Sequence, residues 1–312
     1  MLRTLLRLAT WFTVLAAACV RAAEPAACPP PPVMPTPAQL QAAQAQDRGL
    51  LWRLQRDGRT SYLYGTLHVG KPEWMLHGPR VAAALAGSPV LALEIDPTDA
   101  GVQSALGNQD GDTAALPPAL QARLTRQIAA ACLPGGALDG MAPAMQAVVL
   151  SVLQARWIGL DPSFAQEQSL AQGARSAGRR IVALETVALQ KQVLVPGDAA
   201  SAQALVTQAL DQLESGAGRQ TLVRLARAWE QGDLVTLENY AQWCDCVRND
   251  EERAAMRALN DERNPALAER IEALHREGRP VFAAVGALHM TGPSALPRLL
   301  AARGFVVERV LP

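Results

Sequence analysis

Apolar and polar residues alternate in two stretches near the start of the patterned part of the chain. Alternation over residues 50–55 and 61–64 predicts two strands with one buried face each. Asp57-Gly58 lies between them, and this dipeptide is a strong signal for a two-residue hairpin turn. We therefore expect an antiparallel hairpin whose second strand runs directly into residues 65–68.

Unbroken apolar runs mark further strands. Val90–Leu93 and Ile181–Leu184 are too short for helices, and continuous apolar runs of this length are typical of strands buried on both faces of a sheet. Residues 280–285 and 305–310 predict two more strands near the C-terminus. The chain therefore carries strands at both ends and two more between them.

Between the strands, apolar residues recur every three to four positions, which predicts helices. These segments cover residues 79–86, 118–132, 142–158, 164–177, 199–214, 218–231, 249–277 and 293–303. Strands separated by helices predict βαβ units. We expect an α/β fold with a largely parallel or mixed central sheet, flanking helices and a large helical insertion that packs over one end of the sheet.

The N-terminus falls outside this pattern. Two arginines precede an apolar run over residues 8–18, which is too short to span a bilayer, and small alanines follow it. This layout predicts a secretory signal peptide over residues 1–22. Cys19 raises the alternative of a lipid anchor, but Ala16 stands three residues before it, where leucine is usual. We therefore regard lipid anchoring as the weaker alternative.

Residues 23–47 are rich in proline and alanine and predict an extended tether, followed by a single domain over residues 48–312. No later stretch is long and apolar enough to span a membrane. We expect a periplasmic or secreted protein with no transmembrane segment after signal removal. Lys plus Arg and Asp plus Glu number 29 each, and no basic stripe appears, which argues against a nucleic-acid partner.

Four cysteines remain after the predicted signal peptide. In an exported chain, Cys28, Cys132, Cys244 and Cys246 are disulfide candidates. The Cys-Asp-Cys pair also resembles a metal motif, but zinc pairs usually have a two-residue spacer and no second pair exists here. Cysteines separated by one residue rarely bond each other, so we expect Cys244 and Cys246 each to reach a distant partner.

Two matching motifs, Gly65-Thr66-Leu67-His68 and Gly286-Ala287-Leu288-His289, each follow a predicted strand. Glycine three residues before each histidine permits a sharp exit from the strand or a close backbone approach. Glu94 and Glu185 likewise follow the two unbroken apolar strands. Ligands of open α/β sheets bind beyond the carboxyl ends of the strands, so we expect these four side chains to share one site.

Two imidazoles with a carboxylate form a set that suits a divalent metal, with His68, Glu94 and His289 as ligands. Glu185, or Glu94 if it is not a ligand, would serve as general base. A single strand-end histidine is more often structural, but here two of only four histidines lie in near-identical motifs.

The remaining candidates read as structural residues. His77 lies in a loop close after His68, and we expect it to be a surface residue or to support the site. His275 lies on a polar helix face, where we expect it to be solvated. Asn264 stands before a proline that starts a helix and reads as a helix cap.

These residues resemble the TraB/GumN family, whose animal relatives include the Tiki proteases, from about residue 50 to 310. The resemblance is carried by residues 62–68, 93–94, 183–186 with Gln190, 262–264, 285–289 with Gly292, and 299–305. It implies a fold like those of erythromycin esterase and ChaN. It also implies a peptidase that depends on Mn, Co or Zn and acts on a peptide or protein.

By the same resemblance, His68, Glu94 and His289 are the functional residues, with Glu185, Arg263 and Asn264 supporting. Two alternatives stay open. The histidines could be axial ligands of a haem or iron carrier, or the motifs could be kept by a non-catalytic interaction protein. The carboxylates beside both histidines favour the metal-dependent hydrolase, because haem needs none.

Overall fold

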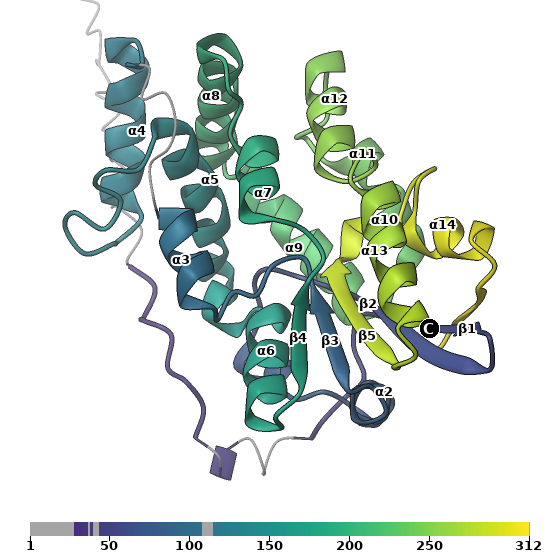
Figure 1. Ribbon diagram of the computed structural model, residues 1–312. Helices are drawn as coiled ribbons and strands as arrows, with labels where there is room; N and C mark the ends of the chain where they lie inside the picture. The colour runs from purple at the N-terminus through teal and green to yellow at the C-terminus, as the bar shows by residue number, and fades with distance from the viewer. Residues whose placement is uncertain (1–27, 37, 40–43, 108–114, 312) are drawn as a thin grey trace, which may run out of the picture.

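The computed structural model describes residues 28–36, 38–39, 44–107 and 115–311. At its centre lies a mixed six-stranded sheet with the strand order β4-β3-β5-β2-β1-β6 (Figure 1). The predicted signal peptide lies outside the described residues. The strands are β1 (Leu50–Arg56), β2 (Arg59–Thr66), β3 (Val90–Leu93), β4 (Arg180–Ala183), β5 (Val281–Gly286) and β6 (Val306–Arg309).

The predicted hairpin is confirmed. β1 and β2 pair antiparallel with Arg56 opposite Arg59. Asp57 and Gly58 form the turn with φ angles of 49° and 67°, the left-handed conformation that Asp-Gly turns accept at low cost. β1 also pairs antiparallel with β6 at the sheet edge.

Four strands, β2, β5, β3 and β4, run parallel to one another, with β5 between β2 and β3 and with β4 beside β3. This confirms the expected α/β fold with a mixed sheet. One expectation was wrong: β4 is an edge strand, and its residues are exposed or half-buried rather than buried on both faces. An apolar run alone does not distinguish a central strand from an edge strand, because strand order depends on distant segments.

Helices cover the sheet and extend beyond one end of it. They are η1 (Pro72–Met75), α2 (Pro79–Ala86), α3 (Ala100–Gly107), α4 (Pro118–Ala130), α5 (Pro143–Leu153), η2 (Gln154–Ile158), η3 (Pro162–Phe164), α6 (Gln166–Ser176), α7 (Val187–Leu194), α8 (Ala199–Ser215), α9 (Ala217–Glu230), α10 (Leu234–Glu238), α11 (Tyr240–Trp243), α12 (Asp250–Leu259), α13 (Asn264–Arg276), η4 (Ala287–Met290) and α14 (Leu296–Ala302). None of the described helices is long and apolar enough to cross a bilayer.

The helical insertion has its own core. Leu124 of α4, Leu150 of α5 and Leu210 of α8 belong to a buried cluster separate from the core around the sheet. In Figure 1 these helices, with α7 and α12, lie beyond the arrowheads of β3 and β4. The insertion therefore stands over the carboxyl ends of the parallel strands, where the candidate side chains lie.

The tether residues 28–36 carry no regular structure, and Cys28 forms a disulfide with Cys132. Cys244 and Cys246 are bonded to each other, so the expectation of distant partners for them was wrong. The chain turns after α11 and brings their Cα atoms to 5.0 Å, which lies within the ordinary range for disulfides.

His275 is fully buried, so the expected solvated position was also wrong. Its Nδ1 lies 2.8 Å from Oγ of Ser61, and its Nε2 lies 3.1 Å from the carbonyl oxygen of Arg56. The imidazole thereby joins α13 to the β1–β2 hairpin. The helical pattern alone hid this role, because polar neighbours on α13 made that face look solvated.

Candidate functional site

The parallel strands bring the four predicted side chains to one edge of the sheet. Thr66 of β2 pairs with Gly286 of β5, and Leu93 of β3 pairs with Ala284 of β5. Pairing of β3 with β4 continues one residue further, since the Glu185 N–H donates to the carbonyl of Glu94 at 3.0 Å. Glu94 and Glu185 therefore lie side by side.

Gly286 is the point around which three predicted ligands converge. A Cβ atom placed on Gly286 would lie 3.4 Å from Oε1 of Glu94, 3.5 Å from Cδ2 of His289 and 4.0 Å from Nε2 of His68. A Cβ on Gly65 would lie 3.2 Å from the Cα of Ala287. Neither glycine adopts a positive φ, so close approach, rather than a special turn, explains both.

His289 is held from behind by Asn264. The ring lies on η4 with only 4% of its side chain exposed, and its Nδ1 lies 2.6 Å from Oδ1 of Asn264. An N–H at Nδ1 donating to this oxygen leaves the lone pair at Nε2, which lies 4.0 Å from Oε1 of Glu94. Asn264 is therefore not a helix cap: its amide also donates to the carbonyl of Ser294 at 2.8 Å.

His68 is held in the same way by a different partner. Its Nδ1 lies 3.0 Å from Oε1 of Glu167, and 67% of its side chain is exposed. Thr66 donates its hydroxyl to the same carboxylate oxygen at 2.5 Å. Both histidines thus direct Nδ1 toward an oxygen behind the ring, while Nε2 of His68 lies near Gly286 and Nε2 of His289 lies 4.0 Å from Oε1 of Glu94.

Arg263 connects the carboxylates to the second histidine. Its guanidinium donates to Glu94 Oε2 at 2.6 Å and, through two nitrogens, to both oxygens of Glu185. Its Nη1 donates to the carbonyl of Leu259 at 2.8 Å and lies 3.3 Å from Nε2 of His289. These five contacts use all five N–H donors of an arginine, so none is left for a substrate.

Glu185 lies behind this guanidinium. Its side chain is 2% exposed, and it is absent from the residues that border the neighbouring pocket. Gln190 of α7 donates from its amide nitrogen to Glu94 at 3.2 Å and to Glu185 at 3.4 Å. The structure therefore places Glu185 as a residue that positions Arg263.

The electrostatics give the two histidines different protonation states. The carboxylate of Glu167 raises the pKa of His68 to about 9, whereas burial lowers the pKa of His289 to about 4. Burial alone would raise the pKa of Glu94, but His289, His68, Arg263 and the Gly286 N–H together lower it to about 2. At neutral pH, Glu94 is a carboxylate, His289 is neutral and His68 carries a proton.

A pocket opens above this cluster, with about 280 Å³ of empty space. His68, Glu94 and Arg263 lie at its polar end together with Gln190. The remaining lining residues are aliphatic: Val193 and Leu194 of α7 and Leu259 of α12.

Among the described residues, no group of three or more His, Cys, Asp or Glu side chains is arranged so that it could hold a metal ion. Two of the predicted ligands nevertheless lie close to each other. Two atoms bound to the same ion at about 2.1 Å lie at most ~4.2 Å apart, and Nε2 of His289 and Oε1 of Glu94 meet this limit at 4.0 Å. Nε2 of His68 faces the same point beside Gly286.

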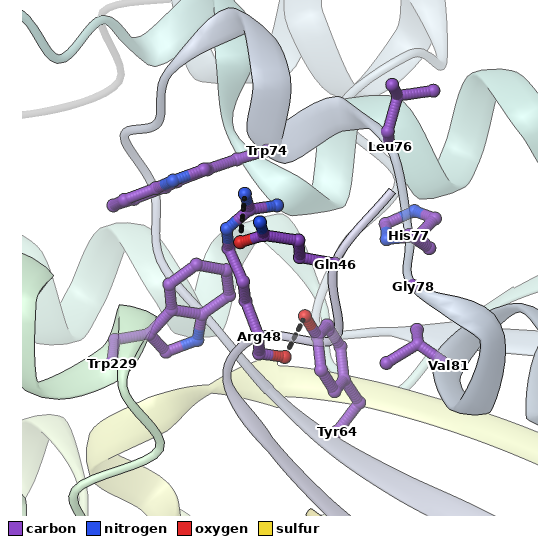
Figure 2. A pocket seen from close by; sticks show the side chains of 9 residues that line it. All are labelled: Gln46, Arg48, Tyr64, Trp74, Leu76, His77, Gly78, Val81 and Trp229. Atoms are coloured by element: carbon purple, nitrogen blue, oxygen red, sulfur yellow. Dashed lines mark hydrogen bonds between the residues drawn. The ribbon is translucent and has the colours of Figure 1, made fainter. Parts of the chain in front are cut away.

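A second hollow lies elsewhere and contains the remaining histidine. Figure 2 shows Gln46, Arg48, Tyr64 and His77 around it, with Trp74 and Trp229 beside Arg48. The Tyr64 hydroxyl donates to the carbonyl of Arg48 at 3.0 Å. Burial lowers the pKa of His77 to about 4. These contacts attach the start of the domain to its core, and His77 is not part of the site around Gly286.

Two site residues were missed from the sequence, Gln166 and Glu167 at the start of α6. Gln166 accepts the Leu67 N–H at 2.8 Å and so fixes the residue before His68. An acid in the first turn of a helix is favoured by the helix dipole alone, so no sequence pattern separates Glu167 from an ordinary helix start.

A model of the TraB/PrgY/gumN family matches residues 50–309. No curated protein and no solved structure matches the chain.

Proposed function

This chain belongs to the TraB/PrgY/gumN family, and on that premise we propose that it is a metal-dependent hydrolase that acts on peptides. Its ligands are Nε2 of His68, Oε1 of Glu94 and Nε2 of His289. Manganese, cobalt and zinc are the candidate ions, because all three accept imidazole and carboxylate ligands.

The observation that carries this proposal is the shared orientation of the two imidazoles. Each Nδ1 contacts an oxygen behind the ring, Glu167 for His68 and Asn264 for His289. Metal-binding histidines are held in this way, because the hydrogen bond at one nitrogen fixes the tautomer and aims the other nitrogen. A purely structural histidine does not need its second ring nitrogen to face a carboxylate, as Nε2 of His289 faces Oε1 of Glu94 at 4.0 Å.

Charge balance supports the same proposal. With both histidines neutral, the carboxylates of Glu94, Glu167 and Glu185 and the guanidinium of Arg263 leave two negative charges. A divalent ion neutralises them. His68 must lose its Nε2 proton before it can act as a ligand, since an imidazolium has no free lone pair there.

A bound divalent ion would supply Lewis acidity at the pocket floor and lower the pKa of water there. The chain's own residues do the rest. Arg263 and Gln190 hold Glu94 through Oε2, so that Oε1 faces Gly286. Glu185 holds Arg263 and does not reach the pocket, which leaves Glu94 as the carboxylate nearest a substrate.

Export is part of the proposal. Long-lived disulfides are typical of oxidising compartments, and the Cys28–Cys132 bond fits a periplasmic or secreted protein. Thiol titration of denatured, unreduced mature protein should find no free thiol, whereas four free thiols would contradict export.

The proposed activity is tested by peptide hydrolysis after removal and return of metal. We expect cleavage of a mixed peptide library to stop with a chelator and to return with manganese, cobalt or zinc, but not in Glu94→Gln protein. An absorption spectrum of the same sample discriminates the haem alternative, since haem bound through histidine gives a Soret band. Metal-independent cleavage, or a Soret band without hydrolysis, would overturn the proposal.

A further inference from the structure

The pocket beside the proposed ligands has an apolar wall that the hydrolase proposal does not use. Val193 and Leu194 lie at the end of α7, and Leu259 ends α12. All three are half-buried, and neither helix contains a fully buried residue. Their aliphatic surface therefore borders the pocket and is not fully buried in the core.

The polar end of the pocket can accept a hydrogen bond from a neutral group. The amide nitrogen of Gln190 donates to both Glu94 and Glu185. With both of its hydrogens directed at carboxylates, the amide oxygen is the atom left to accept an N–H. A peptide backbone supplies such an N–H.

The same end of the pocket disfavours an anionic group. Arg263 has already committed its five donors to protein acceptors. Glu94 borders the pocket, Glu185 contacts Arg263, and Glu167 contacts His68. An acidic side chain entering here would meet the carboxylate of Glu94, and the two cations that line the pocket, Arg263 and protonated His68, are already paired with carboxylates.

We propose that Val193, Leu194 and Leu259 form a subsite for the aliphatic side chain of a peptide residue next to the scissile bond, with Gln190 accepting a backbone N–H of the substrate. This assignment of substrate class rests on the proposed hydrolase function. A branched aliphatic side chain suits the wall because it covers half-exposed apolar surface, and the free energy of burial grows with the area removed from water. Glycine covers none of it, and aspartate adds a charge.

Binding and cleavage test the subsite separately. The binding probes are N-acetyl-leucine N-methylamide and its glycine and aspartate counterparts, titrated into ¹⁵N-labelled protein and followed by NMR. We expect the leucine probe to bind at least about tenfold more tightly than the other two and to shift the amide signals of residues 193, 194 and 259. In the peptide library, cleavage should concentrate beside leucine, isoleucine and valine.

The chain offers a matched control on one helix. Leu194 borders the pocket, whereas Leu189 of the same helix is 37% exposed and does not border it. Leu194→Gln should abolish the preference for the leucine probe, and Leu189→Gln should leave it unchanged. Both positions are partly solvated, so both variants should fold.

The outcomes separate the subsite from the hydrolase. Selective binding of the leucine probe without cleavage of any peptide would support the subsite and contradict the proposed function. Equal affinities, no binding of any probe, or equal behaviour of Leu194→Gln and Leu189→Gln would overturn the subsite, even if hydrolysis depended on metal.

Discussion

Oδ1 of Asn264 lies 2.6 Å from Nδ1 of His289, and this contact fixes the direction of a histidine whose side chain is 4% exposed. The partner of His68 is a carboxylate, Glu167, instead of an amide. Both rings therefore have an oxygen partner at Nδ1, but they differ in their affinity for a proton.

Asn264→Ala should weaken divalent-metal binding about 10–100-fold, because His289 would lose the acceptor that fixes its tautomer. Competition with a fluorescent chelator measures the change. Asn239→Ala is the matched control, since the side-chain amide of Asn239 donates to the helical carbonyl of Val235. Metal affinity that is unchanged in Asn264→Ala would show that ring orientation does not depend on this contact.

Glu167→Gln should lower the pKa of His68 from about 9 toward its ordinary value near 6.5. A pKa raised in the folded state adds stability that is complete below pH 6.5 and is lost as pH rises through 9. The variant should therefore lose this part of the pH dependence. NMR titration of the metal-free protein reports the pKa, with Glu308→Gln on β6 as the control; an unshifted pKa in Glu167→Gln would contradict the pairing.

Replacing Glu185 and replacing Glu94 should have different effects on metal affinity and on the free energy of unfolding. Glu185→Gln removes the charged partner of Arg263 and should lower the free energy of unfolding by about 1.5–3 kcal/mol, while metal affinity changes less than about tenfold. Glu94→Gln should remove metal binding. Urea unfolding and calorimetric metal titration measure both effects, and loss of metal from both variants alike would mean that Glu185 is itself a ligand.

Because His275 is buried, we expect the stability of the fold to decrease at acidic pH. Burial lowers its pKa in the folded state, so its contribution to stability is complete above pH 6.5 and is lost as pH falls below that value. Its Nδ1 accepts from Ser61, whose oxygen also accepts the Val281 N–H. Ser61→Ala should cost about 1–3 kcal/mol by leaving buried polar groups unpaired; a chemical-denaturation curve equal to that of the unmodified protein would contradict this role.

Much of the fold could be predicted because its signals are local. Asp57-Gly58 specifies a turn by conformation alone, and Val90–Leu93 is recognisable as a strand from its apolar run. The position of β4 at the sheet edge depends on where distant segments pack. The Cys244–Cys246 disulfide depends on a chain turn after α11 that the helical pattern does not mark. No local pattern contains that information.

The site residues likewise divide into those that a local sequence pattern predicts and those that it does not. His68, Glu94 and His289 each follow a strand. Because ligands of open α/β sheets bind beyond the carboxyl ends of the strands, these three residues could be assigned to one site from the sequence. Glu167 comes from a helix start, and its contact with His68 spans 99 residues of sequence. Glu185 follows the same rule as Glu94, yet Arg263 lies between it and the pocket, which only the three-dimensional arrangement reveals.

The most direct test of the central claim is the metal content of histidine variants. Metal-free protein is dialysed against zinc, manganese or cobalt and then analysed for bound metal, with His77→Ala as the control because His77 borders the other hollow. The account predicts about one ion per chain in the unmodified protein and in His77→Ala, and none in folded His68→Ala or His289→Ala. Equal metal content in all four proteins, or none in the unmodified protein, would contradict it.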